Sequence, residues 1–201
     1  MGKQTGVVLY YQSIPVVYGQ PVTFWAMVYP VNPPFFGNPV LWTPTGYVRF
    51  TWGRFSLGSA LLNGFPGAPM ATFTISTQNA DTYPIVAEYL GDSSFAPSTS
   101  GVEIETVLPT TSSSTLISSM NPSTFSQAVT FTAAVTSPTV IVKGPVTFTV
   151  GKTTLGVVEL SRGIATLTTS SLPKGTSTVV VTYLGDSNIT QTSASVVQVV
   201  Q

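Results

Sequence analysis

The sequence contains one short stretch twice: residues 89–95 read YLGDSSF, and residues 183–189, 94 positions later, read YLGDSNI. Glycine adopts backbone conformations that other residues avoid, and an aspartate side chain accepts hydrogen bonds from nearby backbone amides, so each copy predicts a turn after a strand. A tyrosine ends each strand, and we expect its ring at the base of a β-sandwich. The residues expected to build these two corners are Tyr89, Gly91 and Asp92 in the first copy and Tyr183, Gly185 and Asp186 in the second.

The repeat extends over most of the chain, which makes it the first feature to settle. The matching blocks are PVVYGQPVTFWAMV (15–28) with PSTFSQAVTFTAAV (122–135), GYVRFTWGRFSLG (46–58) with GPVTFTVGKTTLG (144–156), and ATFTIS (71–76) with ATLTTS (165–170). The offset between the copies falls from 107 to 98 and then to 94. The first copy therefore carries nine extra residues between Val28 and Gly46, and four more between Gly58 and Ala71.

Apolar residues alternate with polar ones within each block, as in Val22, Phe24, Ala26 and Val28. Alternation with a period of two, broken by Gly, Pro, Asn and Asp clusters, predicts strands of an antiparallel sandwich. The fold class is therefore all-β, with two tandem antiparallel β-sandwich domains. We expect domain 1 over residues 1–108 and domain 2 over residues 109–201, joined by the Pro/Ser/Thr-rich segment VLPTTSSST (107–115).

The ordered blocks resemble the bacterial Ig-like repeat domains of the Big_3 type. The segments that carry the resemblance are VYGQPVTFWAMV, PTGYVRF, SLG and YLGDSSFAPSTS in the first copy, and TFSQAVTFTAAV, KGPVTFTV, TLG and IATLTTSSLPKGTSTVVVTYLGDSN in the second. The resemblance implies an immunoglobulin-like sandwich for each copy. It also implies a role as a spacer, stalk or adhesive module of a large surface protein, and thus an extracellular or cell-surface location.

The composition argues against several classes of function. Seven basic and seven acidic residues leave no net charge, so the sequence lacks the basic stripe that a nucleic-acid-binding protein needs. The absence of cysteine and histidine removes disulfides, thiolate metal sites and histidine-dependent catalysis. No segment is long and apolar enough for a membrane span. The start, MGKQTGVVLYYQS, lacks the apolar stretch of a signal peptide, so the signal of a secreted protein would have been removed or would lie outside this sequence.

The acidic residues do not predict an active site or a metal site. Glu103 and Glu105 share one face of a predicted strand, and we interpret them as solvent-facing residues that protect an edge strand. Asp92 and Asp186 have too few carboxylate neighbours to hold calcium, so we interpret them as turn caps. Asn188 begins the only glycosylation sequon, a triplet that often arises by chance. We expect no enzymatic activity, cofactor or metal.

The first copy is much richer in aromatic residues, with 18 of the 22 in the chain. On the strand after residue 21, the side opposite the core carries Trp25, Met27 and Tyr29, where the second copy has Thr132, Ala134 and Thr136. The nine-residue insertion, about residues 29–43, adds further rings beside this row. The residues predicted to form a contact surface are Trp25, Met27, Tyr29, Phe35, Phe36 and Trp42.

Two interpretations of this surface remain open. The insertion can fold back over the sheet and cover the row as a satellite core, or the row can stay open and contact another molecule. The partner that we expect first is a second copy of the protein, with the terminal strands (5–11 and 194–200) adding to a neighbour's sheet edge and building a filament or surface assembly. Carbohydrate is the rival partner, bound by a stalk or adhesin fragment, and another surface protein is a third.

Overall fold

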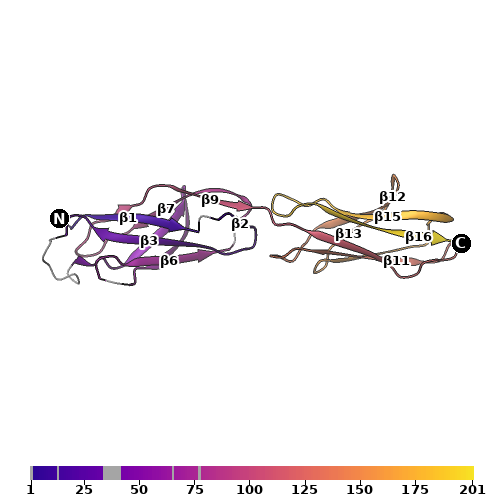
Figure 1. Cartoon of the computed structure of the whole chain (residues 1–201), viewed down its shortest axis with the longest axis horizontal. Coiled ribbons are helices and arrows are strands. Elements are labelled where there is room, and N and C mark those ends of the chain that lie inside the picture. Colours follow the sequence, from indigo (N-terminus) through magenta and orange to yellow (C-terminus); the bar gives the residue numbers. More distant parts are fainter. Residues whose placement is uncertain (1, 13, 34–41, 65, 77) are drawn as a thin grey trace. The chain divides into compact units, whose positions relative to one another are not determined.

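The computed structural model describes residues 2–12, 14–33, 42–64, 66–76 and 78–201. The chain divides into two compact units, Met1–Leu108 (unit 1) and Pro109–Gln201 (unit 2). The named elements of the described chain are all β-strands, and in each unit two sheets enclose one core (Figure 1). The predicted all-β fold with two tandem antiparallel sandwiches is therefore confirmed.

Unit 1 pairs a three-stranded sheet with a larger one. The smaller sheet has the order β1 (Thr5–Tyr11), β3 (Val22–Pro30), β6 (Met70–Ile75). The larger sheet has the order β2 (Val16–Val17), β9 (Glu103–Leu108), β7 (Asp81–Tyr89), β4 (Tyr47–Trp52), β5 (Phe55–Leu61), and β8 (Ser98–Thr99) also pairs with β7. Neighbouring strands are antiparallel except β2 and β9, which are parallel.

The core of unit 1 lies between these sheets, because the alternating pattern sends every second side chain inward. Val22, Phe24, Ala26 and Val28 of β3 are fully buried. The ring of Phe24 lies 6.2 Å from that of Phe50, measured between centroids, so the two sheets meet through aromatic contact. Burial of a side chain of this size contributes roughly 2 kcal/mol, which explains why the repeat keeps these positions apolar.

Unit 2 repeats the arrangement with fewer aromatic side chains. Its smaller sheet has the order β10 (Ser113–Ser118), β11 (Val129–Thr136), β14 (Ile164–Thr169), and its larger sheet has the order β13 (Thr153–Glu159), β12 (Pro145–Val150), β15 (Gly175–Tyr183), β16 (Thr192–Val200). The inward residues of β11 are Val129, Phe131, Ala133 and Val135, each at most 1% exposed. The two units therefore share one framework, and positions that match in the repeat can be compared directly.

The two YLGDS segments form matching corners. Tyr89 ends β7 and Tyr183 ends β15, and both side chains are buried. The next glycines have positive φ angles, +83° at Gly91 and +72° at Gly185, a backbone conformation that side chains disfavour. Asp92 Oδ1 accepts from the backbone amides of Ser94 (2.7 Å) and Phe95 (2.8 Å), and Asp186 Oδ1 accepts from the amides of Asn188 (2.7 Å) and Ile189 (2.9 Å).

The corner of unit 1 has an additional bond to the start of the β4 segment. Thr45 donates to Asp92 Oδ2 through both its amide (2.9 Å) and its hydroxyl (2.7 Å). Burial alone would raise the pKa of Asp92, but the hydrogen bonds from Thr45, Ser94 and Phe95 outweigh it and hold that pKa below its usual value. Burial raises the pKa of the Tyr89 phenol, and the neighbouring Asp92 carboxylate raises it further. The ionised aspartate is thus part of the folded corner.

The structure corrects the interpretation of the glutamates in β9. Glu105 is 1% exposed, and Glu103 is half-buried, whereas Ile104 between them is 50% exposed. Pairing with β7 places Glu105 opposite Tyr83, on the side that faces the core. The expectation of two solvent-facing glutamates was therefore wrong, because both faces of this strand carry apolar residues and the alternation alone could not orient it.

Candidate functional site

The outer side of the β1–β3–β6 sheet is the strongest candidate for an interaction surface. Alternation along β3 sends Trp25, Met27 and Tyr29 away from the core. Trp25 and Met27 are half-buried by their neighbours, and Tyr29 is 38% exposed. These three predicted residues therefore lie in one row on the outer side of the sheet.

The strand register adds side chains that the sequence analysis did not include. On β1, Tyr10 lies opposite Trp25 and Val8 lies opposite Met27, while on β6 Met70 lies opposite Met27 from the other side. Tyr10 is 47% exposed and Met70 is 41% exposed. We call the resulting surface the aromatic face; its residues are Val8, Tyr10, Trp25, Met27, Tyr29 and Met70. The alternation within residues 5–11 was the available signal for Val8 and Tyr10, but only the pairing shows that they flank Trp25 and Met27.

One glycine shapes this face. Gly6 lies opposite Tyr29, and a β-carbon at Gly6 would lie 2.4 Å from Tyr29 Cζ, closer than non-bonded atoms approach. The phenol ring therefore packs directly over the backbone of Gly6, an aromatic ring covering a strand glycine. This contact orders the Tyr29 ring while leaving part of it accessible to a partner.

The equivalent face of unit 2 has a different composition on the same framework. At the positions of Trp25, Met27 and Tyr29 it carries small or polar residues, namely Thr132, Ala134 and Thr136. A Thr–Thr hydrogen bond across the strands is common to both faces, 2.9 Å between the Oγ1 atoms of Thr23 and Thr74 and 2.8 Å between those of Thr130 and Thr168. The exposed apolar residues of the unit 2 face are Ile117 and Ile164. The aromatic side chains on the outer side of β3 are therefore not a requirement of the fold.

The remaining predicted contact residues do not extend the aromatic face. Trp42 is half-buried beside Lys3, whose Nζ lies 4.2 Å from the centroid of the Trp42 ring and 5.2 Å from the centroid of the Phe95 ring. The Lys3 amide also donates to the carbonyl of Ser94 (2.8 Å), so Trp42 lies at the Tyr89 corner. Phe35 and Phe36 lie outside the described residues.

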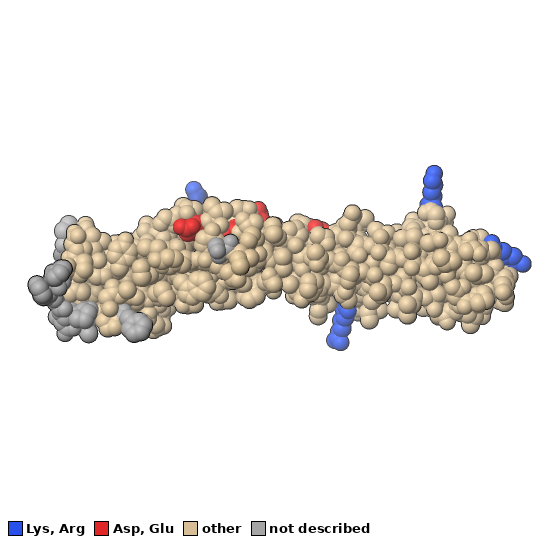
Figure 2. Space-filling model, viewed as in Figure 1, with Lys and Arg blue, Asp and Glu red and all other residues tan. Residues whose placement is uncertain are grey.

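Charged side chains contribute little to the surface. On the side of the molecule shown in Figure 2, acidic and basic residues are few and scattered. The ion pair between Arg49 and Glu88, with 3.1 Å between Arg49 Nε and Glu88 Oε2, joins β4 to β7 in the other sheet of unit 1. The aromatic face itself consists of uncharged residues, so a partner would meet it without removing a charge from water.

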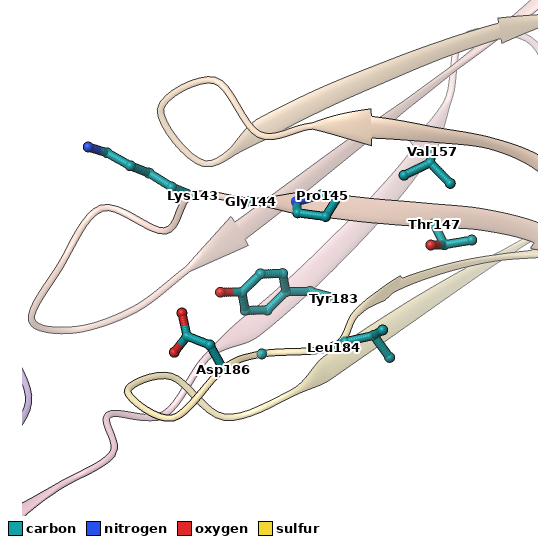
Figure 3. Close-up of a pocket in the computed structure, with 9 residues that line it drawn as sticks. Lys143, Gly144, Pro145, Thr147, Val157, Tyr183, Leu184 and Asp186 are labelled. Atoms are coloured by element: carbon teal, nitrogen blue, oxygen red, sulfur yellow. The ribbon is translucent and has the colours of Figure 1, made fainter. Parts of the chain in front are cut away.

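Unit 2 has a small pocket beside its Tyr183 corner. It has a volume of about 290 Å³ and is lined by Lys143, Gly144, Pro145, Thr147, Val157, Tyr183, Leu184, Gly185 and Asp186. In Figure 3 the Lys143 side chain extends away from Tyr183 and Asp186. The matching position in unit 1 is Thr45, which bonds to Asp92. The pocket thus belongs to the corner framework and does not gather converging polar groups.

The described residues contain no group of three or more acidic, histidine or cysteine side chains arranged to hold a metal ion. Nor does this part of the chain include a helix with the length and hydropathy of a membrane span.

Comparison with known families identifies the fold. The sequence profile of the bacterial Ig-like domain (group 3) matches residues 11–107 and again residues 116–201. The chain belongs to this bacterial Ig-like family. The resemblance drawn from the repeated blocks is thereby confirmed, and units 1 and 2 are its two tandem Ig-like domains. Membership supports a non-catalytic role for these Ig-like domains in a bacterial surface protein.

Solved structures similar to the two Ig-like domains include modules and adhesins of bacteria. The fibronectin(III)-like modules of CbhA from Clostridium thermocellum match with 15% identity and a TM-score of 0.38, over 96% of this chain and 95% of that chain. The adhesin InvE of Yersinia pseudotuberculosis matches with 12% identity and a TM-score of 0.41, over 96% of this chain and 58% of that chain. The Escherichia coli adhesin FdeC matches with 13% identity and a TM-score of 0.35, over 97% of this chain and 64% of that chain. No protein with a curated description matches the sequence.

Proposed function

We propose that this chain is a non-enzymatic, extracellular structural protein whose Ig-like domains form part of a bacterial surface assembly or filament. Its copies associate through the aromatic face of unit 1, with help from the terminal strands. The observation that carries the proposal is the contrast between two matched faces. Trp25, Met27 and Tyr29 stand where an otherwise equivalent domain has threonine and alanine.

The composition of the aromatic face favours a protein partner. Tyrosine, tryptophan and methionine are enriched at the centres of protein interfaces, where charged residues are depleted. The absence of net charge on the chain also removes the repulsion that would keep copies apart. A second copy of the same chain is therefore a suitable partner.

The size of the face favours repeated contacts over a single dimer. A nine-residue strand such as β3 is roughly 30 Å long, and three strands span roughly 14 Å, which gives an area of about 400 Å². A stable dimer usually buries about 800 Å² on each partner. A contact of half that area is weak alone, but it becomes effective when many copies are linked in an array.

The terminal strands offer a second contact of the kind that an array requires. β1 lies at one edge of the small sheet in unit 1. β16 lies at one edge of the large sheet in unit 2, where Asn121 and Ser123 already bond to the backbone of its last residues, so a partner strand would meet it at residues 192–196. An edge strand can pair with a strand of another molecule through its backbone amides and carbonyls. When the two contacts lie on different parts of the surface, association continues from copy to copy.

The proposal is tested with the double variant Trp25→Thr, Tyr29→Thr, which gives the unit 1 face the residues of unit 2. We expect wild-type protein to form assemblies above the 21.1 kDa chain mass, visible by light scattering and electron microscopy, and the variant to remain monomeric with a native circular dichroism spectrum. Tyr47→Thr is the matched control, because Tyr47 is 53% exposed on the other sheet of unit 1.

Each outcome of this experiment is informative. Assembly by the double variant at wild-type levels would refute the role of the aromatic face. Loss of the folded structure in the variant would instead show that the row is a satellite core. A wild-type monomer at all concentrations would exclude the filament and leave the stalk or adhesin as the remaining role.

Carbohydrate is the second candidate partner, favoured by the pairing of two rings on adjacent strands. Tyr10 lies directly opposite Trp25, and Tyr29 lies four residues further along β3, so three aromatic rings lie on one sheet face. Such rings can stack on sugar rings through their apolar surfaces. This function predicts that the monomer binds immobilised glycans and that Trp25→Thr abolishes binding, whereas Tyr47→Thr does not.

A further inference from the structure

Glu105 and Gln198 occupy the same place in the two domains. Glu105 lies on β9 opposite Tyr83, and Gln198 lies on β16 opposite Ser177, at matching positions of the last strand of each unit. Both side chains face inward and are almost completely buried, 1% exposed for Glu105 and 0% for Gln198. The framework therefore places a buried polar side chain at this point twice, once as an acid and once as an amide.

Gln198 is well satisfied by its surroundings. Its Oε1 accepts from the Ser118 hydroxyl (2.6 Å), and its Nε2 donates to the carbonyl of Met120 (2.9 Å) and to the hydroxyl of Ser123 (3.2 Å). These bonds attach β16 to the end of β10 and to the loop that follows. A neutral amide with partners for both its donor and its acceptor can be buried at little cost.

Glu105 has a much poorer environment. Its Oε2 is buried without a hydrogen-bond partner among the described residues. The strands that pack against this part of the core, β1, β2 and β7, contain no lysine or arginine, and neither does β9. The titratable side chains on the same side of its sheet are Asp81 and Tyr83 on β7 and Glu103 on β9. Tyr11 on β1 of the other sheet and Tyr18 after β2 pack against the same core. None of these neighbours can supply a positive charge.

We propose that Glu105 makes the attachment of β9 to unit 1 sensitive to pH. The strand is held stably when the Glu105 carboxyl group is protonated, and it opens locally more often when the carboxyl group is ionised. A protonated carboxyl is neutral and can remain in the apolar interior, whereas an unpaired carboxylate gains hydration if the strand opens. Strand β9 is well placed to open, because it pairs with β7 on one side and only with the two-residue β2 on the other. Local opening at such an edge requires less free energy than global unfolding.

The direction of the pH effect follows from burial. Burial raises the pKa of Glu105 above the ordinary value of 4.5. The folded state therefore binds the proton more tightly than the unfolded state, and the stabilisation is complete below pH 4.5 and is lost as the pH rises through the folded-state pKa. Gln198 does not ionise, so the matching position does not make the stability of unit 2 depend on pH.

The test uses the intact 201-residue chain and its tryptophan fluorescence, because all three tryptophans lie in unit 1. Urea unfolding is followed at intervals between pH 4.5 and pH 8. We expect the unfolding midpoint of the wild type to fall as the pH rises, with the unfolding equilibrium constant increasing by up to about tenfold per pH unit where Glu105 titrates. Glu105→Gln should remove most of this dependence.

Two further variants keep the result interpretable. Glu103→Gln is the matched control on the same strand and face, and it should retain the wild-type pH dependence. If the glutamine variant folds poorly, Glu105→Met also tests whether Glu105 causes the pH dependence, since methionine fills a similar volume without an ionisable group. Hydrogen exchange of the β9 amides, corrected for intrinsic rates, should show protection that declines with pH in the wild type and stays constant in the Glu105 variants.

The proposal is overturned if wild-type stability and β9 protection do not change across this pH range. It is also overturned if Glu105→Gln or Glu105→Met keeps the wild-type slope, or if Glu103→Gln abolishes it.

Discussion

The matched positions of Gln198 and Glu105 allow one substitution to be tested twice with opposite expected signs. We consider Gln198→Met, which keeps an unbranched side chain of similar length but removes the amide. The change breaks the bonds to Ser118, Met120 and Ser123, and it leaves the Ser123 hydroxyl buried without its partner. The framework of unit 2 is otherwise unchanged.

The expected loss can be worked out from these contacts. Each of the three hydrogen bonds contributes about 1 kcal/mol, and an orphaned buried hydroxyl costs about 1 kcal/mol more. Burial of the more apolar methionine side chain stabilises the folded unit by roughly 1 kcal/mol. The net destabilisation of unit 2 is therefore about 3 kcal/mol.

The assay is hydrogen exchange measured by mass spectrometry on the full chain, read from the β15 and β16 amides, since unit 2 has no tryptophan. A loss of 3 kcal/mol would appear as a roughly 150-fold faster exchange through unfolding of this unit. Glu105→Met is the matched comparison, and its effect is read from tryptophan fluorescence in unit 1. There no bond to Oε2 is lost and a buried carboxyl group without a charge partner is removed, so unit 1 should become about 1 kcal/mol more stable at neutral pH.

An increase of less than about fivefold in the exchange rates of unit 2 in Gln198→Met would contradict the expected loss of stability. Destabilisation of unit 1 by Glu105→Met to a similar extent would contradict the expected difference between the two sites. Either result would mean that the polar contacts at this position do not determine the stability of the last strand.

Two further predictions concern the corner and the packing between the sheets. Asp92→Ala should destabilise unit 1 by about 2 kcal/mol, because Asp92 accepts four hydrogen bonds, two of them from Thr45. Asp186→Ala should destabilise unit 2 less, because Lys143 stands at the position of Thr45 there. Because folding lowers the pKa of Asp92, the stability that this carboxylate gives unit 1 is present above pH 3.8 and is lost as the pH falls through the pKa of the folded state. Acid unfolding of the wild type and of Asp92→Ala measures this contribution. Gly58→Ala should lower the free energy of unfolding of unit 1 by about 2 kcal/mol, because a β-carbon there would lie 2.4 Å from the Phe73 ring. Gly156→Ala should cost unit 2 less, because its β-carbon would meet the movable Leu167 methyl group at 2.8 Å. Thermal unfolding measures both losses, and equal losses would contradict this prediction.

The aromatic face shows where prediction from sequence stops. Comparison of the two copies was enough to single out Trp25, Met27 and Tyr29, because a repeat supplies its own reference for what the fold requires. It could not add Tyr10 or Met70, which join the face through pairing between strands distant in the sequence. It also grouped Trp42 with this row, whereas that side chain contacts Lys3 at the corner of the unit.

Four features can be read directly from the residues: the repeat, the alternation of the strands, the YLGDS corners and the near absence of charge. These are local properties, since a strand's two faces and a turn's glycine depend on residues within a few positions. Which faces meet depends instead on the pairing of strands that are distant in the sequence. In β9 both alternating sets, Glu103, Glu105 and Val107 on one side and Ile104, Thr106 and Leu108 on the other, contain apolar residues. Only the register with β7 turns Glu105 inward, because the orientation of a strand of ambiguous pattern is set by its pairing partners.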